Sequence, residues 1–263
     1  MALTDGIIAA YTPQRNGTGY TVLDRSGRNT HLAWTSPATA NWKADGGYVY
    51  PNTTDNGDFI AASRSIPATV TRWSIIHWVK ATTYASTANS IDGNRAIYSS
   101  GNVGPRLEFG AAATWIYSAD TASGGVTTTH ACGTSLPAAG TWLMLAITHN
   151  GATTSTTYQQ GLPSGLAQSN LSGATGAFLG SFGAFRLGQG SSDSGRGWDG
   201  LIGATVLFSR QLTAAEVWQI YQAGPSASWA TTQTKRRVYG FVPAGFRAYL
   251  ARRNSQIIGG GVR

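Results

Sequence analysis

Short apolar segments recur along the chain and are separated by residues that favour turns. The segment at 73–79 alternates and is rich in aromatic and β-branched side chains, which is typical of a strand. The regular spacing of such segments predicts an all-β antiparallel sandwich or barrel, and the lack of a crossover-helix rhythm disfavours an α/β fold. We expect strands at residues 6–11, 47–50, 59–62, 73–79, 96–99, 106–109, 114–117, 142–148, 155–158, 185–187 and 201–208.

One short helix is predicted after the last of these strands. Thr213 and Glu216 have the spacing of a capping box, in which each side chain satisfies a free backbone amide of the other. Apolar residues at 217, 220 and 221 give the helix one buried face, and Gly224-Pro225 ends it. We expect this helix to lie as a lid on an edge of the sandwich.

Charge divides the chain into two parts. Only 11% of the residues are charged, against roughly 25% in an average globular domain. Residues 1–216 hold 12 Lys/Arg and 11 Asp/Glu, whereas residues 217–263 hold seven basic residues and no acidic one. We therefore predict a sandwich domain at 1–224 and an extended basic arm at 225–263, which docks on a polyanion or an acidic protein surface. The alternative is a solvated extension.

The predicted arm also carries aromatic side chains, which a purely solvating segment does not need. Its basic and aromatic residues are the expected assembly contacts: Lys235, Arg236, Arg237, Tyr239, Phe241, Phe246, Arg247, Tyr249, Arg252 and Arg253.

The cysteine content and the N-terminal sequence bear on whether the protein is exported from the cell. Cys132 is the single cysteine, so no intrachain disulfide can form. The first residues lack a basic region followed by an apolar one, so we expect no signal peptide. No apolar run has the length of a membrane span, and we expect no membrane partner.

An ordered set of motifs over residues 5–224 resembles laminin-G-like and concanavalin-A-like jelly rolls. The motifs lie at residues 6–11, 24–28, 45–49, 73–80, 141–151, 158–161, 185–188 and 200–216. This resemblance implies a jelly-roll sandwich with one short helix. Asn150 stands where the family often has Asp, and Gln160 where Asp or Asn is usual, so the carboxylate pattern does not support the calcium site that some members build.

The residues do not suggest catalysis. Glycoside hydrolysis needs two carboxylates across the sugar, but the chain has only two Glu, with Glu108 on an expected strand and Glu216 in the helix cap. His130 and Cys132 lie two apart without an orienting acid nearby in sequence, and the four His lack metal-ligand spacing. We expect no catalytic residue, no metal site and no cofactor; a diverged glycoside-active enzyme is a distant alternative.

A glycine-rich segment before residue 200 is the candidate ligand loop at one end of the sandwich. Planar rings can stack on sugars, and Trp198 is the strongest such candidate, ahead of Trp34, Trp42 and Trp115. The alternative is that these Trp fill the core and that the acidic residues support turns. The candidate ligand-loop residues are Asp193, Arg196, Trp198 and Asp199.

The end of the chain resembles the C-termini of virion proteins of tailed bacteriophages, through the segments at 235–237, 249–253 and 256–263. The main hypothesis is therefore a non-enzymatic virion structural protein, assembled in the host cytoplasm. It would be a capsid decoration or cement protein, or a head–tail accessory, that forms a homo-oligomer and docks on major capsid or tail subunits. The alternative is a carbohydrate-binding adhesin that recognises host glycans. Nucleic acid is not an expected partner.

Overall fold

Most of the chain up to residue 226 is described by the computed structural model. The described residues are 3–14, 19, 21–34, 42–53, 60–62, 70–83, 89–93, 96–98, 101–103, 105–109, 115–120, 127–131, 137–151, 154–160, 162–169, 185–188, 198 and 200–226. The predicted arm at 225–263 lies outside them except for its first two residues.

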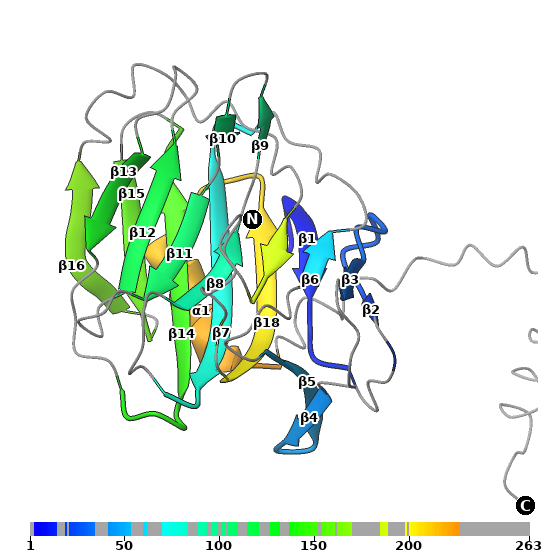
Figure 1. The fold of residues 1–263 in the computed structure, drawn as a ribbon. Helices are drawn as coiled ribbons and strands as arrows, with labels where there is room; N and C mark the ends of the chain where they lie inside the picture. Colours follow the sequence, from blue (N-terminus) through cyan, green and yellow to red (C-terminus); the bar gives the residue numbers. More distant parts are fainter. Residues whose placement is uncertain are drawn as a thin grey trace, which may run out of the picture.

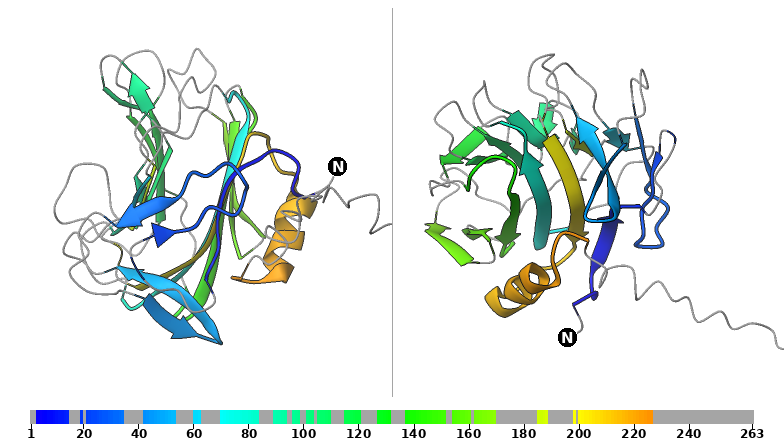
Figure 2. Two further views of the ribbon diagram at one scale, coloured as in Figure 1. Left: turned by 90° about the vertical axis from the view of Figure 1, so that its right-hand side faces the viewer. Right: turned by 90° about the horizontal axis from the view of Figure 1, so that it is seen from below.

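Two antiparallel sheets face each other and form a sandwich (Figures 1 and 2). The first has the order β16-β15-β14-β7-β18-β5-β4, and β1 also pairs with β18. Its strands are β1 Ile7–Tyr11, β4 Trp42–Asp45, β5 Tyr48–Thr53, β7 Trp73–Ala81, β14 Trp142–His149, β15 Thr154–Gln159, β16 Leu162–Ser169 and β18 Gly200–Phe208.

The second sheet has the order β13-β12-β11-β8-β17-β6-β3-β2, and β9 and β10 form a separate pair. These strands are β2 Thr21–Val22, β3 Leu32–Trp34, β6 Ile60–Ala62, β8 Asn89–Gly93, β9 Ala96–Tyr98, β10 Gly101–Val103, β11 Pro105–Phe109, β12 Trp115–Asp120, β13 Thr127–Ala131 and β17 Arg186–Leu187. The predicted all-β antiparallel sandwich is confirmed, and every expected strand is found. Strands such as β13 and β16 were missed because they lack regular apolar alternation.

The main core lies between the sheets. Alternate residues of β7 and β14, including Trp73, Ile75 and Leu145, pack with Leu32 and Leu107 of the opposite sheet. All five side chains are at most 1% exposed. The period of two that identified these strands in the sequence therefore marks the face that meets the second sheet.

The first sheet is buried on its outer face as well, and helix α1 (Ala214–Ala223), the one helix among the described residues, covers it (Figure 2). Val217 and Ile220 pack with Ile76, Met144 and Val206 of the sheet. The expected capping box is confirmed, but the expected position on a sandwich edge is wrong. Because the outward-facing residues of the central strands are also apolar, the helix has to cover the face.

A β-bulge interrupts the strand under the end of this helix. Ile202 and Leu207 both lie in the core between the sheets, although regular alternation would place residues five apart on opposite faces. Ile202 pairs with Val79 and Thr205 with His77, so three steps on β18 match two on β7. Because of the extra residue, the side chain of Leu207 in the second half of β18 points into the core, as that of Ile202 does in the first half.

Candidate functional site

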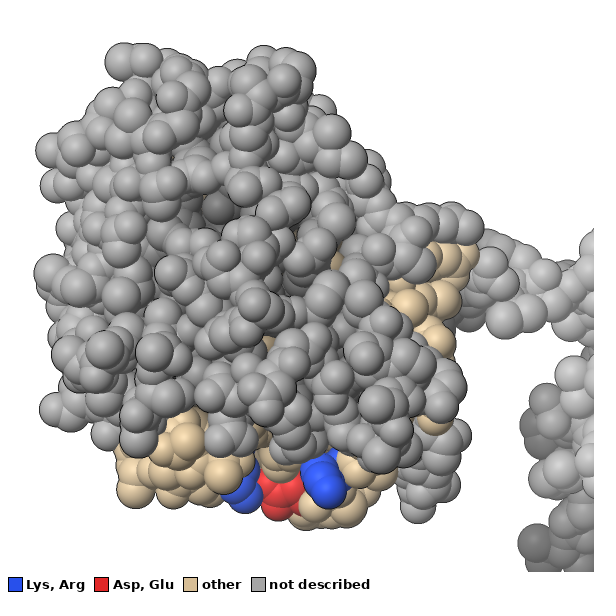
Figure 3. Space-filling model, in the orientation of Figure 1, with Lys and Arg blue, Asp and Glu red and all other residues tan. Residues whose placement is uncertain are grey.

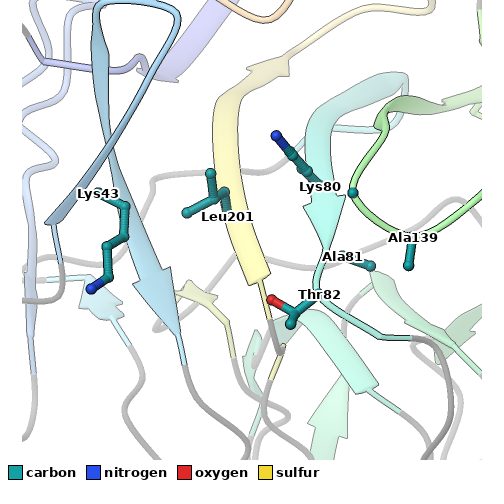
Figure 4. Close-up of a pocket in the computed structure, with 7 residues that line it drawn as sticks. Lys43, Lys80, Ala81, Thr82, Ala139 and Leu201 are labelled. Atoms are coloured by element: carbon teal, nitrogen blue, oxygen red, sulfur yellow. The ribbon is translucent and has the colours of Figure 1, made fainter.

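An open hollow of about 500 Å³ lies at the end of the first sheet where the β4–β5 hairpin projects (Figures 1 and 4). In Figure 4 the side chain of Leu201 lies between the strands that carry Lys43 and Lys80. The hollow is lined by Lys43, Lys80, Ala81, Thr82, Ala139, Gly140 and Leu201.

Backbone contacts at two glycines hold together the strand ends around the hollow. Gly140 has a positive φ of 82° and its amide donates to the carbonyl of Ala81 at 2.8 Å, which holds the turn before β14 on the end of β7. Gly200 has a φ of 146°, and a Cβ there would lie 2.2 Å from the carbonyl oxygen of Lys80. Only glycine allows β18 to approach β7 this closely.

The Asp45 carboxylate joins the hairpin to the sheet. Its Oδ2 accepts hydrogen bonds from Lys80 Nζ at 3.0 Å and from Trp142 Nε1 at 2.9 Å. The Lys80 and Asp45 side chains are both 29% exposed. This contact orients Lys80 at the wall of the hollow and occupies the nearby carboxylate.

Aromatic rings lie on the same face of the hairpin as the charged residues. Lys43 pairs with Tyr50 and Asp45 with Tyr48 across the two strands, and cross-strand partners share a face. Tyr50 is buried with its ring 4.8 Å from that of Trp142, whereas Tyr48 is 43% exposed. Burial raises the pKa of the Tyr50 hydroxyl, and the charge of Asp45 adds to this effect. Tyr48 thus exposes part of its ring on the hairpin, opposite Asp45.

Among the described residues that line the hollow, Lys43 and Lys80 carry positive charge and none carries negative charge. Lys43 is exposed, and within the described part of the chain it has no ion pair. Figure 3 shows acidic surface flanked by basic surface at this end of the molecule. Lys43 therefore offers an anionic ligand group an ammonium group that no described carboxylate pairs with.

Two other carboxylates are committed to the fold. Asp24 is buried and accepts hydrogen bonds from the amides of Ala10, Ser26 and Thr30 and from the hydroxyls of Ser26 and Thr30. Burial alone would raise the pKa of Asp24, but these hydrogen bonds outweigh it and the net shift is downward. The hydrogen bond from Arg210 is the main cause that lowers the pKa of Glu216 in the helix cap.

The two histidines described on the central strands are buried. His77 Nδ1 lies 3.1 Å from the Thr205 hydroxyl. His149 Nδ1 lies 3.1 Å from the Ser155 hydroxyl, and its ring stacks on Trp73 at 5.5 Å. Burial lowers the pKa of His149 to about 4, so this ring is neutral near pH 7. The side chain of His130 and the whole of Cys132 lie outside the described residues.

The candidate ligand loop is revised at Trp198. Its ring is fully buried in the core, and its Nε1 donates to the carbonyl of Leu201 at 3.2 Å. A buried ring offers no face to a sugar, so Trp198 takes the core position that was the alternative to stacking. Trp42 is partly buried and donates to the carbonyl of Gly19. Asp193, Arg196, Asp199 and the side chains of Trp34 and Trp115 lie outside the described residues.

The arm residues from Lys235 to Arg253 also lie outside the described residues, so their assembly role stays a prediction. Sequence reasoning did not select Lys43, Lys80 or Thr82. One feature of the sequence could have indicated this site: Lys80 is a charged residue at the end of an apolar strand. In the sequence analysis Lys80 served only as part of the motif at 73–80 that indicates the fold.

No three His, Cys, Asp or Glu side chains come together as a metal-binding group within the described residues. In the same part of the chain, no helix has the length and apolar character needed to cross a membrane.

The family is shown by a match over residues 52–218 to the model described as the concanavalin A-like lectin/glucanases superfamily. The chain belongs to this family. No curated protein sequence matches the concanavalin A-like chain.

Solved structures share the concanavalin A-like fold at low identity. The botulinum neurotoxin serotype D binding domain is 16% identical with a TM-score of 0.59, and the match covers 84% of this chain and 52% of that one. The serotype D ligand binding domain in complex with N-acetylneuraminic acid is 16% identical with a TM-score of 0.58, over 84% and 51% of the chains.

A Trypanosoma rangeli sialidase in complex with sialic acid is 15% identical with a TM-score of 0.58, over 87% of this chain and 34% of that one. The chain therefore spans about half or a third of the length of these proteins. At such identities the comparison shows the shared fold.

Proposed function

We propose that this domain binds carbohydrate in the hollow between the β4–β5 hairpin and the ends of β7 and β18. The observation that carries the proposal is the combination of groups in one open site: apolar Leu201, the hydroxyl of Thr82 and the ammonium groups of Lys43 and Lys80. Sugars present apolar ring faces and hydroxyls together, and binding sites for small molecules combine both kinds of contact.

The comparisons agree with this choice of function. The family is described as lectins and glucanases, and two of the structures similar in fold contain N-acetylneuraminic acid or sialic acid. These are properties of other proteins, and they support carbohydrate binding above the virion role as the first hypothesis.

Binding without hydrolysis is the chemistry we propose. Glycosidases usually place two carboxyl groups on either side of the scissile bond. Among the described residues that line the hollow none is acidic, and the nearby Asp45 already accepts from Lys80 and Trp142. The described part of the site therefore does not supply the acid and base pair that cleavage requires.

The test is binding of the full chain to a broad glycan panel, followed by calorimetry on the best ligand. Ala139 lines the hollow and is exposed, so Ala139→Trp should fill the hollow without disturbing the core. Ala138→Trp places the same side chain on an exposed neighbour that does not line it. We expect a loss of at least about tenfold in affinity for Ala139→Trp alone, which corresponds to about 1.4 kcal/mol.

Absence of any glycan binding at millimolar concentration would contradict the proposal. Equal loss in both Trp variants would move the binding site away from the hollow.

A virion role remains a second proposal, favoured by the seven basic residues and no acidic one in 217–263. In this proposal the arm attaches the domain to capsid or tail subunits and the sandwich faces outward, where many copies would add avidity. Quantitative mass spectrometry of purified phage particles tests it, with the major capsid protein as the reference. Hundreds of copies would indicate capsid decoration, a few dozen a neck or tail position, and none would refute the virion role.

A further inference from the structure

We infer that the hollow selects acidic sugars, and that Lys43 binds their carboxylate. The inference rests on the proposed carbohydrate binding and adds the chemical class of the ligand. Its basis is a difference between the two lysines that line the hollow: Lys80 forms an ion pair with Asp45, and Lys43 has no ion pair among the described residues.

Lys80 is already neutralised within the protein. Its ammonium group lies 3.0 Å from Asp45 Oδ2, and Trp142 holds the same oxygen from the other side. Lys80 can still contact a ligand at the wall of the hollow, but its charge is balanced. It therefore serves mainly to position the hairpin.

Lys43 carries the charge that remains. It is exposed on β4, it lines the hollow, and it has no ion pair among the described residues. The neighbouring carboxylate of Asp45 is oriented by its bonds to Lys80 and Trp142. A sugar carboxylate next to Lys43 would form a charge-assisted hydrogen bond, which is stronger than a bond between neutral groups.

The rest of the site suits the remainder of such a sugar. Leu201, Ala81 and Ala139 provide apolar surface for a ring face, and the Thr82 hydroxyl can exchange hydrogen bonds with sugar hydroxyls. Among the described lining residues none is acidic, so none of these side chains repels the anion. A neutral sugar would make the same apolar contacts and leave Lys43 unused.

The experiment compares matched sugars on the full chain by calorimetry at low ionic strength. The probes are glucuronic acid against glucose, galacturonic acid against galactose, and N-acetylneuraminic acid against its methyl ester. We expect the acidic member of at least one pair to bind about tenfold more tightly, and this preference to weaken as salt rises.

Variants then identify the charge that is responsible. Lys43→Gln should remove the preference for the acidic sugar, and Lys43→Arg should retain it. Arg28→Gln is the matched control, because it also removes one exposed positive charge. Arg28 bonds the carbonyl of Ile7, which pairs with Phe208 at the opposite end of β18 from Leu201. Lys235→Gln controls for a general attraction by the basic C-terminal segment.

The outcomes separate this inference from the proposed function. Equal affinity for acidic and neutral members, with binding still blocked by Ala139→Trp, would overturn the inference and keep carbohydrate binding. Competition by acetate at the same concentration as the acidic sugar would also overturn it, since the site would then bind any carboxylate. An equal loss of preference in Lys43→Gln and Arg28→Gln would show an unspecific charge effect and refute the role of Lys43.

Discussion

The amide of Ala204 donates a 3.1 Å hydrogen bond to the carbonyl of Pro225. Ala204 lies in the bulge of β18, between Ile202 and Thr205. Its hydrogen-bond acceptor, Pro225, follows directly after the end of helix α1. Pro225 also lies over Gly203, where an added Cβ would be 3.3 Å from its carbonyl oxygen. The root of the C-terminal segment is therefore fixed on the outer face of the first sheet.

Truncation of the chain after different residues should show that Pro225 stabilises the fold and that the residues after 226 do not. We expect a chain that ends at Ser226 to keep the sandwich folded. A chain that ends at Gly224 removes the acceptor of the buried Ala204 amide, which should cost about 1–3 kcal/mol. Denaturant unfolding of both chains measures the difference. Unfolding of the longer chain would show that residues after 226 belong to the core and would refute the predicted boundary.

Asp24→Asn should destabilise the domain strongly, by about 2–4 kcal/mol, because an amide group would meet donors that now bond a carboxylate. The folded pKa of Asp24 lies below its unfolded value. Its stabilisation is therefore present above the unfolded pKa, near 4, and is lost as the pH falls through the folded pKa. Unfolding free energies measured from pH 2 to 6 should show a smaller slope in the variant; an unchanged slope would contradict this role.

Replacing Gly200 by Ala should prevent folding or destabilise the domain by more than about 3 kcal/mol, since its Cβ would meet the Lys80 carbonyl at 2.2 Å. Gly27→Ala is the control for backbone strain alone, because its φ is also positive and open space surrounds it. It should cost about 1–2 kcal/mol. Circular dichroism melts of the two variants provide the comparison, and similar losses would mean that the close approach of β18 to β7 is unimportant.

His149 should make stability depend on pH in a different window. The folded pKa of about 4 lies below the unfolded value near 6.5, so the unfolded chain binds more protons between these two values. Stability should then rise with pH from about 4 to about 6.5 and be lost on acidification through that range. His149→Gln should flatten this part of the profile, with Asp24→Asn as the comparison that acts at lower pH. A wild-type profile that is flat between pH 4 and 6.5 would contradict the shift.

Elements that depend only on neighbouring residues could be predicted from the sequence. The strands β7 and β14 followed from apolar and aromatic alternation, and Thr213 with Glu216 fixed the start of the helix through contacts three residues apart. The family motifs added the jelly-roll class. These features depend on neighbours within one strand or one helical turn, so the order of residues is enough to define them.

The candidate site depends on residues that are distant in the chain. Lys43, Lys80, Thr82, Ala139 and Leu201 meet because a hairpin, two strand ends and a turn converge at one end of the first sheet. Trp198 also depends on distant contacts. It follows a glycine-rich segment that the sequence analysis took as a candidate ligand loop, but its side chain is buried in the core.

The sequence by itself determined the all-β class, most of the strong strands, the capped helix and the uneven charge. Only the tertiary structure decided that the helix covers the outer face, that Asp45 neutralises Lys80, and that Lys43 is left with an unbalanced charge. The physical reason is that strand alternation is local, whereas the pairing order of strands and the contacts between their ends are set by long-range packing.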